Sequence, residues 1–337
     1  MLQVDFHRAA REGTLTEIPR DLLNLANFTL PNASGTTAIH LAARHGHLDQ
    51  VPAGFLVEST LLIENEAGYT AIHHAAGGGH LNQIAPALLT RENLLRRSRS
   101  GFTPIHLAAA AGHLAQIPAG LVTAELAAIK TDLGSTPLHE AAEAGTLNRL
   151  PAAMASESSF REKNINGETV FHVAALNGHL DQIADSLLTD ETIALTTFSN
   201  DSVMHAAALA GYLHQVPARL LTPANLLLAS KKGFTPMHAA AETGHLHQIP
   251  DRLITAELLL ARNDIGDTPL HGAASEGHLG QVPARFLTSE NLSVQNIDGY
   301  TPMIVAIARG HSDTIPPHAR PKAQGLLAKL RAFFGGR

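Results

Sequence analysis

Histidine is the most abundant ionisable residue type in this sequence, with 21 copies, and cysteine is absent. Without cysteine the chain has no disulfides, thiolate zinc sites, iron–sulfur clusters or cysteine nucleophile. The nearest approach to a zinc motif is His139-Glu140-Ala141-Ala142-Glu143, in which Glu143 stands where H-E-x-x-H needs its second histidine. A phosphate-binding loop and a Gly-x-Ser-x-Gly nucleophile elbow are also missing. We therefore predict no enzyme, no cofactor and no small-molecule substrate.

Most of the histidines occupy two fixed places in a unit of 33 residues. Nine share the first place: His7, His40, His73, His106, His139, His172, His205, His238 and His271. Seven share the second: His47, His80, His113, His179, His245, His278 and His311. Zinc needs three or four converging ligands, whereas equivalent residues of successive units form a ladder. We predict that these histidines are structural and that there is no metal site.

Two series of glycines define the elements that position the histidines. The first series, called the frame glycines, comprises Gly35, Gly68, Gly101, Gly134, Gly167, Gly233, Gly266 and Gly299, with Asn200 in the missing place. The second follows eleven residues later, from Gly46 to Gly310, and Gly13 extends it toward the N-terminus. Ten units thus cover residues 2–331 without an insertion or deletion. This regularity predicts one elongated repeat domain over residues 1–337.

The residues after each frame glycine predict a helix with defined ends. Thr103 is a suitable N-cap, and Pro104 suits the first helical position, where a missing N–H costs nothing. Alanines allow neighbouring units to approach closely, and Gly112 can adopt the left-handed conformation that ends a helix.

On these residues the chain resembles the ankyrin repeat family. The resemblance rests on the T-P-L-H-x-A signature, present at residues 136–141 and 268–273 and in looser form in most other units. It implies an all-α ankyrin-repeat solenoid of about ten 33-residue units. In this fold helix pairs stack, and short loops or hairpins project to one side to form a concave face.

The second half of each unit departs from the family pattern because it carries proline where a second helix usually continues. The prolines in phase are Pro19, Pro52, Pro118, Pro151, Pro217, Pro250, Pro283 and Pro316. A proline inside a helix costs about 3 kcal/mol, so we predict that each one begins a shortened second helix, such as 118–122. A further helical turn is expected after Thr90, Thr222 and Thr288. Such variants resemble bacterial ankyrin arrays.

The ends of the array are expected to differ from its interior. We predict an N-terminal capping unit over 1–34, eight internal repeats over 35–298, and a last repeat with a tail over 299–337. The tail from Pro321 has apolar residues at helical spacing and basic but no acidic residues. Three alternatives remain for it: a terminal cap, a basic amphipathic segment that touches a membrane or a second partner, or an unstructured extension.

Charge and targeting signals narrow the compartment and the partners. The net charge is −6, which disfavours nucleic-acid binding. The first 20 residues lack the apolar core of a signal peptide, and the most apolar stretch, 105–129, contains glycine and proline. We expect a soluble, cytoplasmic protein, and translocation into a host cell stays open.

The resemblance also implies which positions are exposed on the concave face: the two residues before the frame glycine, the one after it, and the two after the Ala-Ala pair. Aromatic residues follow the frame position at Tyr69, Phe102, Phe234 and Tyr300, and Arg99 lies near Phe102. Aromatic residues and arginine are enriched in binding hot spots. Alternatively, each ring only covers the neighbouring loop.

The same positions are mostly acidic from the fifth unit onward. The acids are Asp132, Glu143, Glu168, Asp201, Glu242, Asp264, Asp267, Glu276 and Asp298, against Lys231, Lys232 and Arg309. A surface lined by one sign of charge focuses its field. We hypothesise that this part binds a basic segment of a partner, while the Tyr69–Phe102 part anchors an apolar or acidic one. The alternative is a solvated face without a partner.

Together these features favour a non-catalytic protein-binding scaffold that engages a partner protein or peptide on its concave surface. The alternative is an effector or targeting adaptor whose basic tail docks a membrane or a second partner.

Overall fold

Each repeat begins with an α-helix of seven or eight residues, bounded by the capping residues that the sequence predicts. The computed structural model describes residues 5–320. In α3 (Ala38–His45), the Thr37 side chain accepts a hydrogen bond from the His40 N–H, and Gly46 closes the helix at φ 78°. Thr235 begins its helix in the same way, by accepting from the His238 N–H (3.3 Å). The predicted caps are confirmed, and they fix the register of every signature histidine.

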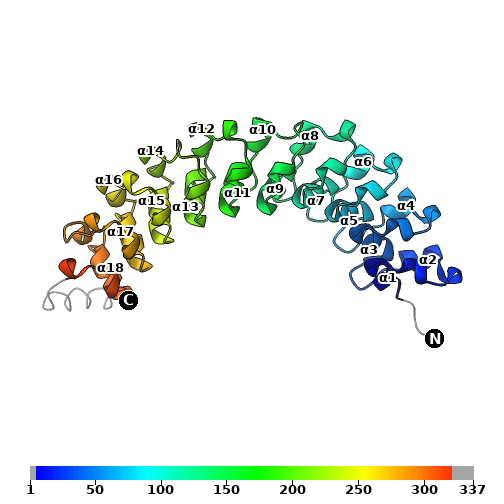
Figure 1. The fold of residues 1–337 in the computed structure, drawn as a ribbon, viewed down its shortest axis with the longest axis horizontal. Coiled ribbons are helices and arrows are strands. Elements are labelled where there is room, and N and C mark those ends of the chain that lie inside the picture. The colour runs from blue at the N-terminus through cyan, green and yellow to red at the C-terminus, as the bar shows by residue number, and fades with distance from the viewer. Residues whose placement is uncertain (1–4, 321–337) are drawn as a thin grey trace. The chain divides into compact units, whose positions relative to one another are not determined.

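Contacts divide the chain into two compact units between Val170 and Phe171, called here the N-terminal half and the C-terminal half. The inner helices of the N-terminal half are α1 (Phe6–Glu12), α3, α5 (Ala71–Gly78), α7 (Pro104–Ala111) and α9 (Pro137–Ala144). Its outer helices are α2 (Leu25–Thr29), α4 (Glu58–Leu61), α6 (Arg91–Leu94), α8 (Ala124–Ala127) and α10 (Glu157–Phe160). Neighbouring inner helices pack on one another, and α4, α6 and α8 lie on the opposite side of that row (Figure 1).

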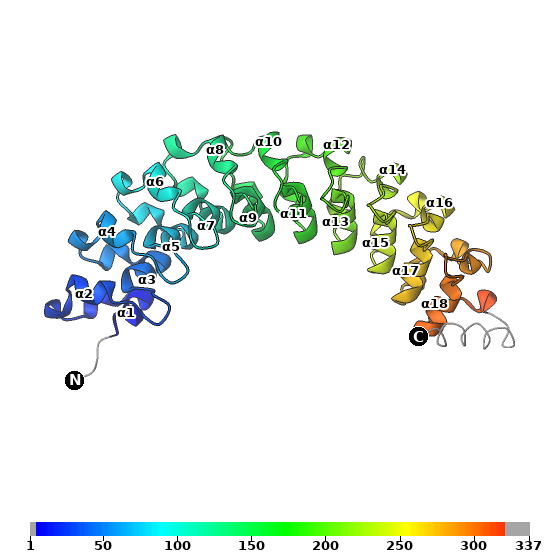
Figure 2. The ribbon, with the colours of Figure 1, turned by 180° about the vertical axis from the view of Figure 1, so that it is seen from behind.

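The C-terminal half repeats this plan. Helix α11 (Val170–Asn177) lies at the division, and the inner helices that follow are α13 (Val203–Ala210), α15 (Pro236–Glu242), α17 (Pro269–Ser275) and α18 (Pro302–Arg309). The outer helices are α12 (Asp190–Ile193), α14 (Pro223–Leu226) and α16 (Ala256–Leu260). Helices α13, α15, α17 and α18 pack in sequence, as Figure 2 shows.

Two 3-10 turns replace the second α-helix of the usual repeat. In one repeat they are η7 (Leu114–Gln116) and η8 (Ala119–Leu121), with Pro118 immediately before η8. The proline therefore begins a helical segment and does not interrupt one, as predicted, but the segment is a 3-10 turn and not an α-helix. The physical reason is the residue before proline, which is held in extended geometry: Ile117 has φ −74° and ψ 135°.

Most other repeats follow the same scheme, but after Pro151 and Pro217 the chain forms a turn in place of the second 3-10 helix. In the N-terminal half the remaining 3-10 turns are η1 (Leu15–Glu17), η2 (Arg20–Leu22), η3 (Leu48–Gln50), η4 (Ala53–Phe55), η5 (Leu81–Gln83), η6 (Pro86–Leu88) and η9 (Leu147–Arg149). In the C-terminal half they are η10 (Leu180–Gln182), η11 (Asp185–Leu187), η12 (Leu213–Gln215), η13 (Leu246–Gln248), η14 (Asp251–Leu253), η15 (Leu279–Gln281), η16 (Ala284–Phe286), η17 (Asn291–Ser293), η18 (Ser312–Thr314) and η19 (Pro317–Ala319). The turns expected after Thr90 and Thr222 are the outer helices α6 and α14, whereas η17 follows Thr288.

The structure has no strand over residues 5–320, so the fold is the predicted all-α ankyrin-type solenoid. Hairpin-like loops join the repeats, and isolated bridges pair Lys163 with Thr169 and Thr196 with Ser202. The substitution at position 200 is explained by backbone geometry: Asn200 has φ 65°, the one positive value at a non-glycine residue in the described part of the chain.

Histidine and glutamine ladders tie each repeat to the next. The N–H of Thr268 donates to Nδ1 of His271 (3.1 Å), so the proton is on Nε2, which donates to the Tyr300 carbonyl of the next repeat (3.1 Å). Each of the nine signature histidines makes such a bond to the next repeat, in keeping with the structural role predicted for them. Gln83 makes the second ladder: its oxygen accepts from the Leu48 N–H and its nitrogen donates to the Gly46 carbonyl.

The predictions for the C-terminal tail and for membrane spanning extend to residues outside 5–320. The tail from Pro321 to Arg337 lies outside the described residues, as does its role as cap or docking segment. Over residues 5–320, none of the helices has the length and apolar character to cross a membrane.

Candidate functional site

The loops that join the repeats present their tip residues on a rigid base. In the loop before α17, the Asn263 carboxamide oxygen accepts from the N–H groups of Ile265 (3.1 Å) and Asp267 (2.9 Å). The N–H of Ile297 in the next loop donates to the Ile265 carbonyl (3.0 Å). The Asp264 N–H likewise donates to the Lys232 carbonyl of the preceding loop (3.0 Å). Because successive loops are joined through their backbones, the tip side chains stand at fixed spacing.

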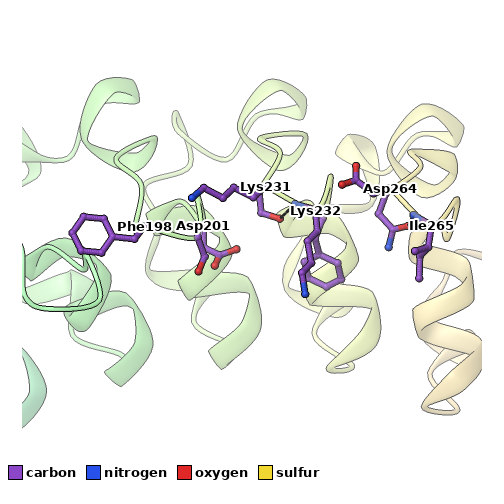
Figure 3. Close-up of a pocket in the computed structure, with 10 residues that line it drawn as sticks. Phe198, Asp201, Lys231, Lys232, Asp264 and Ile265 are labelled. Atoms are coloured by element: carbon purple, nitrogen blue, oxygen red, sulfur yellow. Dashed lines mark hydrogen bonds between the residues drawn. The ribbon is translucent and has the colours of Figure 1, made fainter.

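A hollow of about 700 Å³ opens among three of these loops in the C-terminal half. Its lining comprises Phe198, Ser199, Asp201, Ser230, Lys231, Lys232, Phe234, Asn263, Asp264 and Ile265. The labelled side chains in Figure 3 follow the loops from Phe198 at one end to Ile265 at the other. Phe198 is 59% exposed and Ile265 is 57% exposed. We call this the loop-tip hollow.

A second hollow of about 260 Å³ lies deeper, between the loops and the inner helices of the same half. Its lining comprises Phe234, His238, Glu242, Asn263, Asp267, Thr268, His271, Gly272, Ser275, Asn296, Tyr300, Val305 and Arg309. We call it the Gly272 hollow. Phe234 and Asn263 line both hollows, so the two are adjacent.

The structure brings together most of the site residues predicted in the C-terminal half. Asp201 and Phe234 line the loop-tip hollow, and Phe234, Glu242, Asp267 and Tyr300 line the Gly272 hollow. Glu276 lies close enough for its charge to act on Glu242: burial, then the charges of Glu276 and Asp267, raise the pKa of the Glu242 carboxyl. The carboxylates of this region are therefore poorly compensated.

The aromatic residues predicted in the N-terminal half cover histidines of their own repeats. The Tyr69 ring meets the rings of His73 and His74 edge-on, with centroids 5.4 Å and 6.2 Å apart. The Phe102 ring meets His106 at 5.8 Å. These contacts give each ring a structural role. The partner contact proposed for them is not tested by this geometry.

The charged residues predicted in the N-terminal half have separate surroundings. Arg99 is exposed beside its loop tip, while Asp132 pairs with Arg97 across neighbouring loops at 2.6 Å. Glu168 is half-buried and accepts a hydrogen bond from the Asn164 side chain (2.7 Å). Glu143 is exposed on α9.

A titrating carboxyl that the sequence did not single out as a site lies next to Glu143. Burial, and then the charge of Glu143, raises the pKa of Glu140 to about 7. The pKa values of the signature histidines are shifted in the opposite direction, downward. Burial lowers the pKa of His73, His106 and His238 to about 4, against their carbonyl hydrogen bonds, which raise it. These imidazoles are neutral at pH 7, as their hydrogen bonds require.

The apolar loop tips are the feature that sequence reasoning missed. Leu133, Ile165, Phe198, Ile265 and Ile297 are all more than half exposed, and each lies one or two residues before a frame position. The signal was available, because these positions were already assigned as exposed. The predicted contacts at these positions are charged residues, and the apolar ones are not among them. Large exposed apolar groups at fixed spacing typically mark interaction surfaces.

Comparison with known proteins supports the fold. Residues 6–89 match the family model of ankyrin repeats (3 copies). The curated proteins include no match to this chain.

Proposed function

We propose that this chain is a non-catalytic scaffold that binds a partner protein, because residues 6–89 match a model of ankyrin repeats, which are generally protein–protein interaction modules. The partner's segment lies over the loop tips and inner helices of the C-terminal half. This placement combines the two kinds of surface that protein interfaces use, apolar contacts and complementary charge.

The observation that carries the proposal is the loop-tip hollow. Phe198 and Ile265 are exposed at its two ends, and polar and charged side chains lie between them. Apolar residues at this exposure are unfavourable in water unless something covers them. The backbone bonds between loops preorganise the surface, so little ordering entropy is lost when a segment binds.

The acids beside the hollow support a segment with basic character. Glu242 and Asp267 line the adjacent Gly272 hollow, and Glu276 acts on Glu242 through its charge. In the N-terminal half, Tyr69, Phe102 and exposed Arg99 offer the apolar and basic surface proposed for a different part of the partner.

A selection experiment tests this function directly. The full chain is used as bait for a phage-displayed library of random linear 12-residue peptides, and enriched peptides are synthesised and titrated by calorimetry. We expect Phe198→Ser with Ile265→Ser to weaken binding at least tenfold, since each loses apolar contact area. The matched control is Val57→Ser, an exposed apolar residue (43%) that precedes α4 and where serine is a good cap.

Two results would contradict the proposal. One is a selection in which no peptide is enriched on the full chain. The other is a set of peptides whose affinity the double variant leaves unchanged relative to Val57→Ser.

A further inference from the structure

One inner helix has a glycine at its variable signature position, and this glycine lines the Gly272 hollow. In the T-P-L-H-x-A signature, the place of x is Glu140 in α9 and Gly272 in α17. A Cβ built on Gly272 would lie 3.2 Å from Cβ of Glu242, closer than ordinary van der Waals contact. The glycine thus lets α15 and its Glu242 approach α17 closely, and a side chain at this place would have to displace Glu242.

The rim of the hollow alternates aromatic and acidic groups. Phe234, Asp267 and Tyr300 are the residues that follow the frame glycine in three consecutive repeats, so a carboxylate stands between two rings. Asn296 holds the carboxylate in place by donating to Oδ1 of Asp267 (2.7 Å). The imidazole of His238 fixes the backbone below it by donating to the Asp267 carbonyl (3.1 Å).

The charge in and around the hollow is negative. Three carboxylates, those of Glu242, Asp267 and Glu276, act on this region, and Arg309 is the base in the lining. None of the ion pairs found within residues 5–320 involves these three acids. Arg262, the other nearby base, uses its guanidinium on the carbonyls of Gly266 and Gln295.

The two histidines in the lining do not offset the acids. His238 and His271 each donate one ring N–H to a carbonyl of the next repeat, and burial lowers the pKa of both. At pH 7 the carboxylates of Glu242 and Asp267 outnumber the one base in the lining, Arg309, so the hollow has a net negative charge between two aromatic rings.

We propose that the Gly272 hollow receives a single arginine side chain from the segment that binds the loop-tip hollow. This inference rests on the proposed function and specifies the chemistry of its partner. The guanidinium is planar and always charged, so it can lie against the faces of Phe234 and Tyr300 and donate to the carboxylates of Asp267 and Glu242. The volume, about 260 Å³, is below the roughly 300–1,000 Å³ of pockets for drug-sized ligands and suits one side chain.

The test uses the peptides that the full chain enriches. We expect them to share an arginine. Replacing that arginine with citrulline, which keeps the shape and removes the charge, is expected to weaken binding at least tenfold, and replacement with lysine is expected to weaken it less. Glu242→Gln and Asp267→Asn in the chain should each reduce the affinity for the arginine peptide and leave the affinity for the citrulline peptide nearly unchanged. Glu257→Gln, an exposed acid of α16, is the matched control.

Two further variants separate the hollow from general electrostatics. Gly272→Val fills the space without changing charge, and valine occupies the same place at Val173 and Val305. It should remove the preference for arginine over citrulline. Arg309→Gln removes the competing base and should strengthen arginine binding.

The outcomes distinguish this inference from the proposed function. Enriched peptides without a common arginine, a preference for lysine, or an arginine preference that survives both Gly272→Val and Asp267→Asn would overturn the inference and leave the scaffold function standing. A chain that enriches no peptide overturns both. Far-UV circular dichroism and melting of each variant show that its fold is retained.

Discussion

Two repeats carry the full Thr-Pro-Leu-His-x-Ala signature, one in each half, and they differ at x. In the N-terminal half x is Glu140, a half-buried carboxyl whose pKa burial and Glu143 raise to about 7. In the C-terminal half x is Gly272, and the space is a hollow. The shared residues are placed alike: His139 and His271 each accept from their threonine N–H at 3.1 Å and donate to a carbonyl of the next repeat at 3.1 Å.

This difference shows how a regular array acquires a site. The signature residues hold the backbone of the repeat in place, and their polar groups are used for this purpose. Both ring nitrogens of His139 and of His271 are hydrogen-bonded to the backbone. The variable residue x is free to fill the inner surface or to leave it open. The site that we propose therefore depends on a residue that contributes nothing to the repeat signature.

The prediction with the largest expected change in stability tests whether the signature residues of these two repeats contribute equally to it. Replacing either histidine with alanine leaves a buried threonine N–H without a partner, which costs about 1–3 kcal/mol. It also removes one of two hydrogen bonds to a carbonyl of the next repeat, a loss of about 1 kcal/mol, because the N–H of Asn164 or Asn296 still donates to that carbonyl. We expect His139→Ala and His271→Ala to destabilise their halves by about 3 kcal/mol each, with a difference under about 1 kcal/mol. Native-state hydrogen exchange of the amides in α9 and α17 measures each half separately, which a global melt of a repeat array does not.

Unequal losses of stability in His139→Ala and His271→Ala would contradict this prediction. They would show that the two repeats differ in their signature residues as well as at x. Glu92→Gln, a change at an exposed acid of α6, serves as the control for substitution itself.

The second prediction concerns pH and applies to the N-terminal half. The pKa of Glu140 is about 7 in the folded chain against 4.5 for an ordinary glutamate, so the folded state holds the proton more tightly. Its contribution to stability is complete below pH 4.5 and is lost as the pH rises through 7. Glu140→Gln should thus match the original chain at pH 4 and exceed it by about 1–2 kcal/mol at pH 8, after allowance for partial exposure.

The histidines change the stability with pH in the opposite direction, but this does not affect the difference between the original chain and Glu140→Gln. Their pKa values are lowered by burial, several to about 4, so both proteins lose stability as the pH falls from 6.5 toward 4. That loss is common to the original chain and to Glu140→Gln and cancels in their difference. A Glu140→Gln gain that is the same at pH 4 and pH 8, measured by denaturant unfolding, would show that Glu140 does not titrate as described.

The sequence predicts the frame well because the same local rules recur in every repeat. Caps at Thr37 and Gly46, the helical register and the histidine ladder all depend on residues close in sequence or one repeat away. The left-handed backbone at Asn200 was also predictable, since asparagine replaced glycine in phase.

The hollows and the titrating carboxyl could not be predicted in the same way. A hollow is a volume that neighbours leave unfilled, so Gly272 acquires meaning only once α15 is placed beside it. The raised pKa of Glu140 depends on burial, which composition does not reveal. The break between the two 3-10 turns of a repeat arises because the residue before proline, such as Ile117, is restricted to extended geometry.

The third prediction is smaller and isolates the cost of keeping the hollow. Glycine inside a helix is less favourable than alanine by about 1 kcal/mol, and Gly272 has ordinary backbone geometry because its φ is not positive. Gly272→Ala should therefore stabilise α17 by up to about 1 kcal/mol, reduced by the contact with Glu242. Gly277→Ala is the contrast. There φ is +80° and the new Cβ would lie 2.8 Å from Nδ1 of His311, so stability should fall. Hydrogen exchange in α17 measures both changes.

The smallest effect distinguishes the loop charges of the two halves. Arg97 and Arg262 hold the same place, four residues before a frame glycine, and each donates to a carbonyl of the next loop at 2.7 Å. Arg97 also pairs with Asp132 at 2.6 Å, whereas the corresponding tip residue opposite Arg262 is Ile297.

Exposed ion pairs contribute about 0–1 kcal/mol and are screened by salt, so Arg97→Ser and Arg262→Ser should each cost less than about 1 kcal/mol. Only the Arg97→Ser cost should shrink between 0.05 and 1 M NaCl, and Asp132→Ser should abolish that salt dependence. If both costs respond to salt equally, the acids of the C-terminal half are compensated after all, and the contrast between a neutralised and an open acidic surface fails.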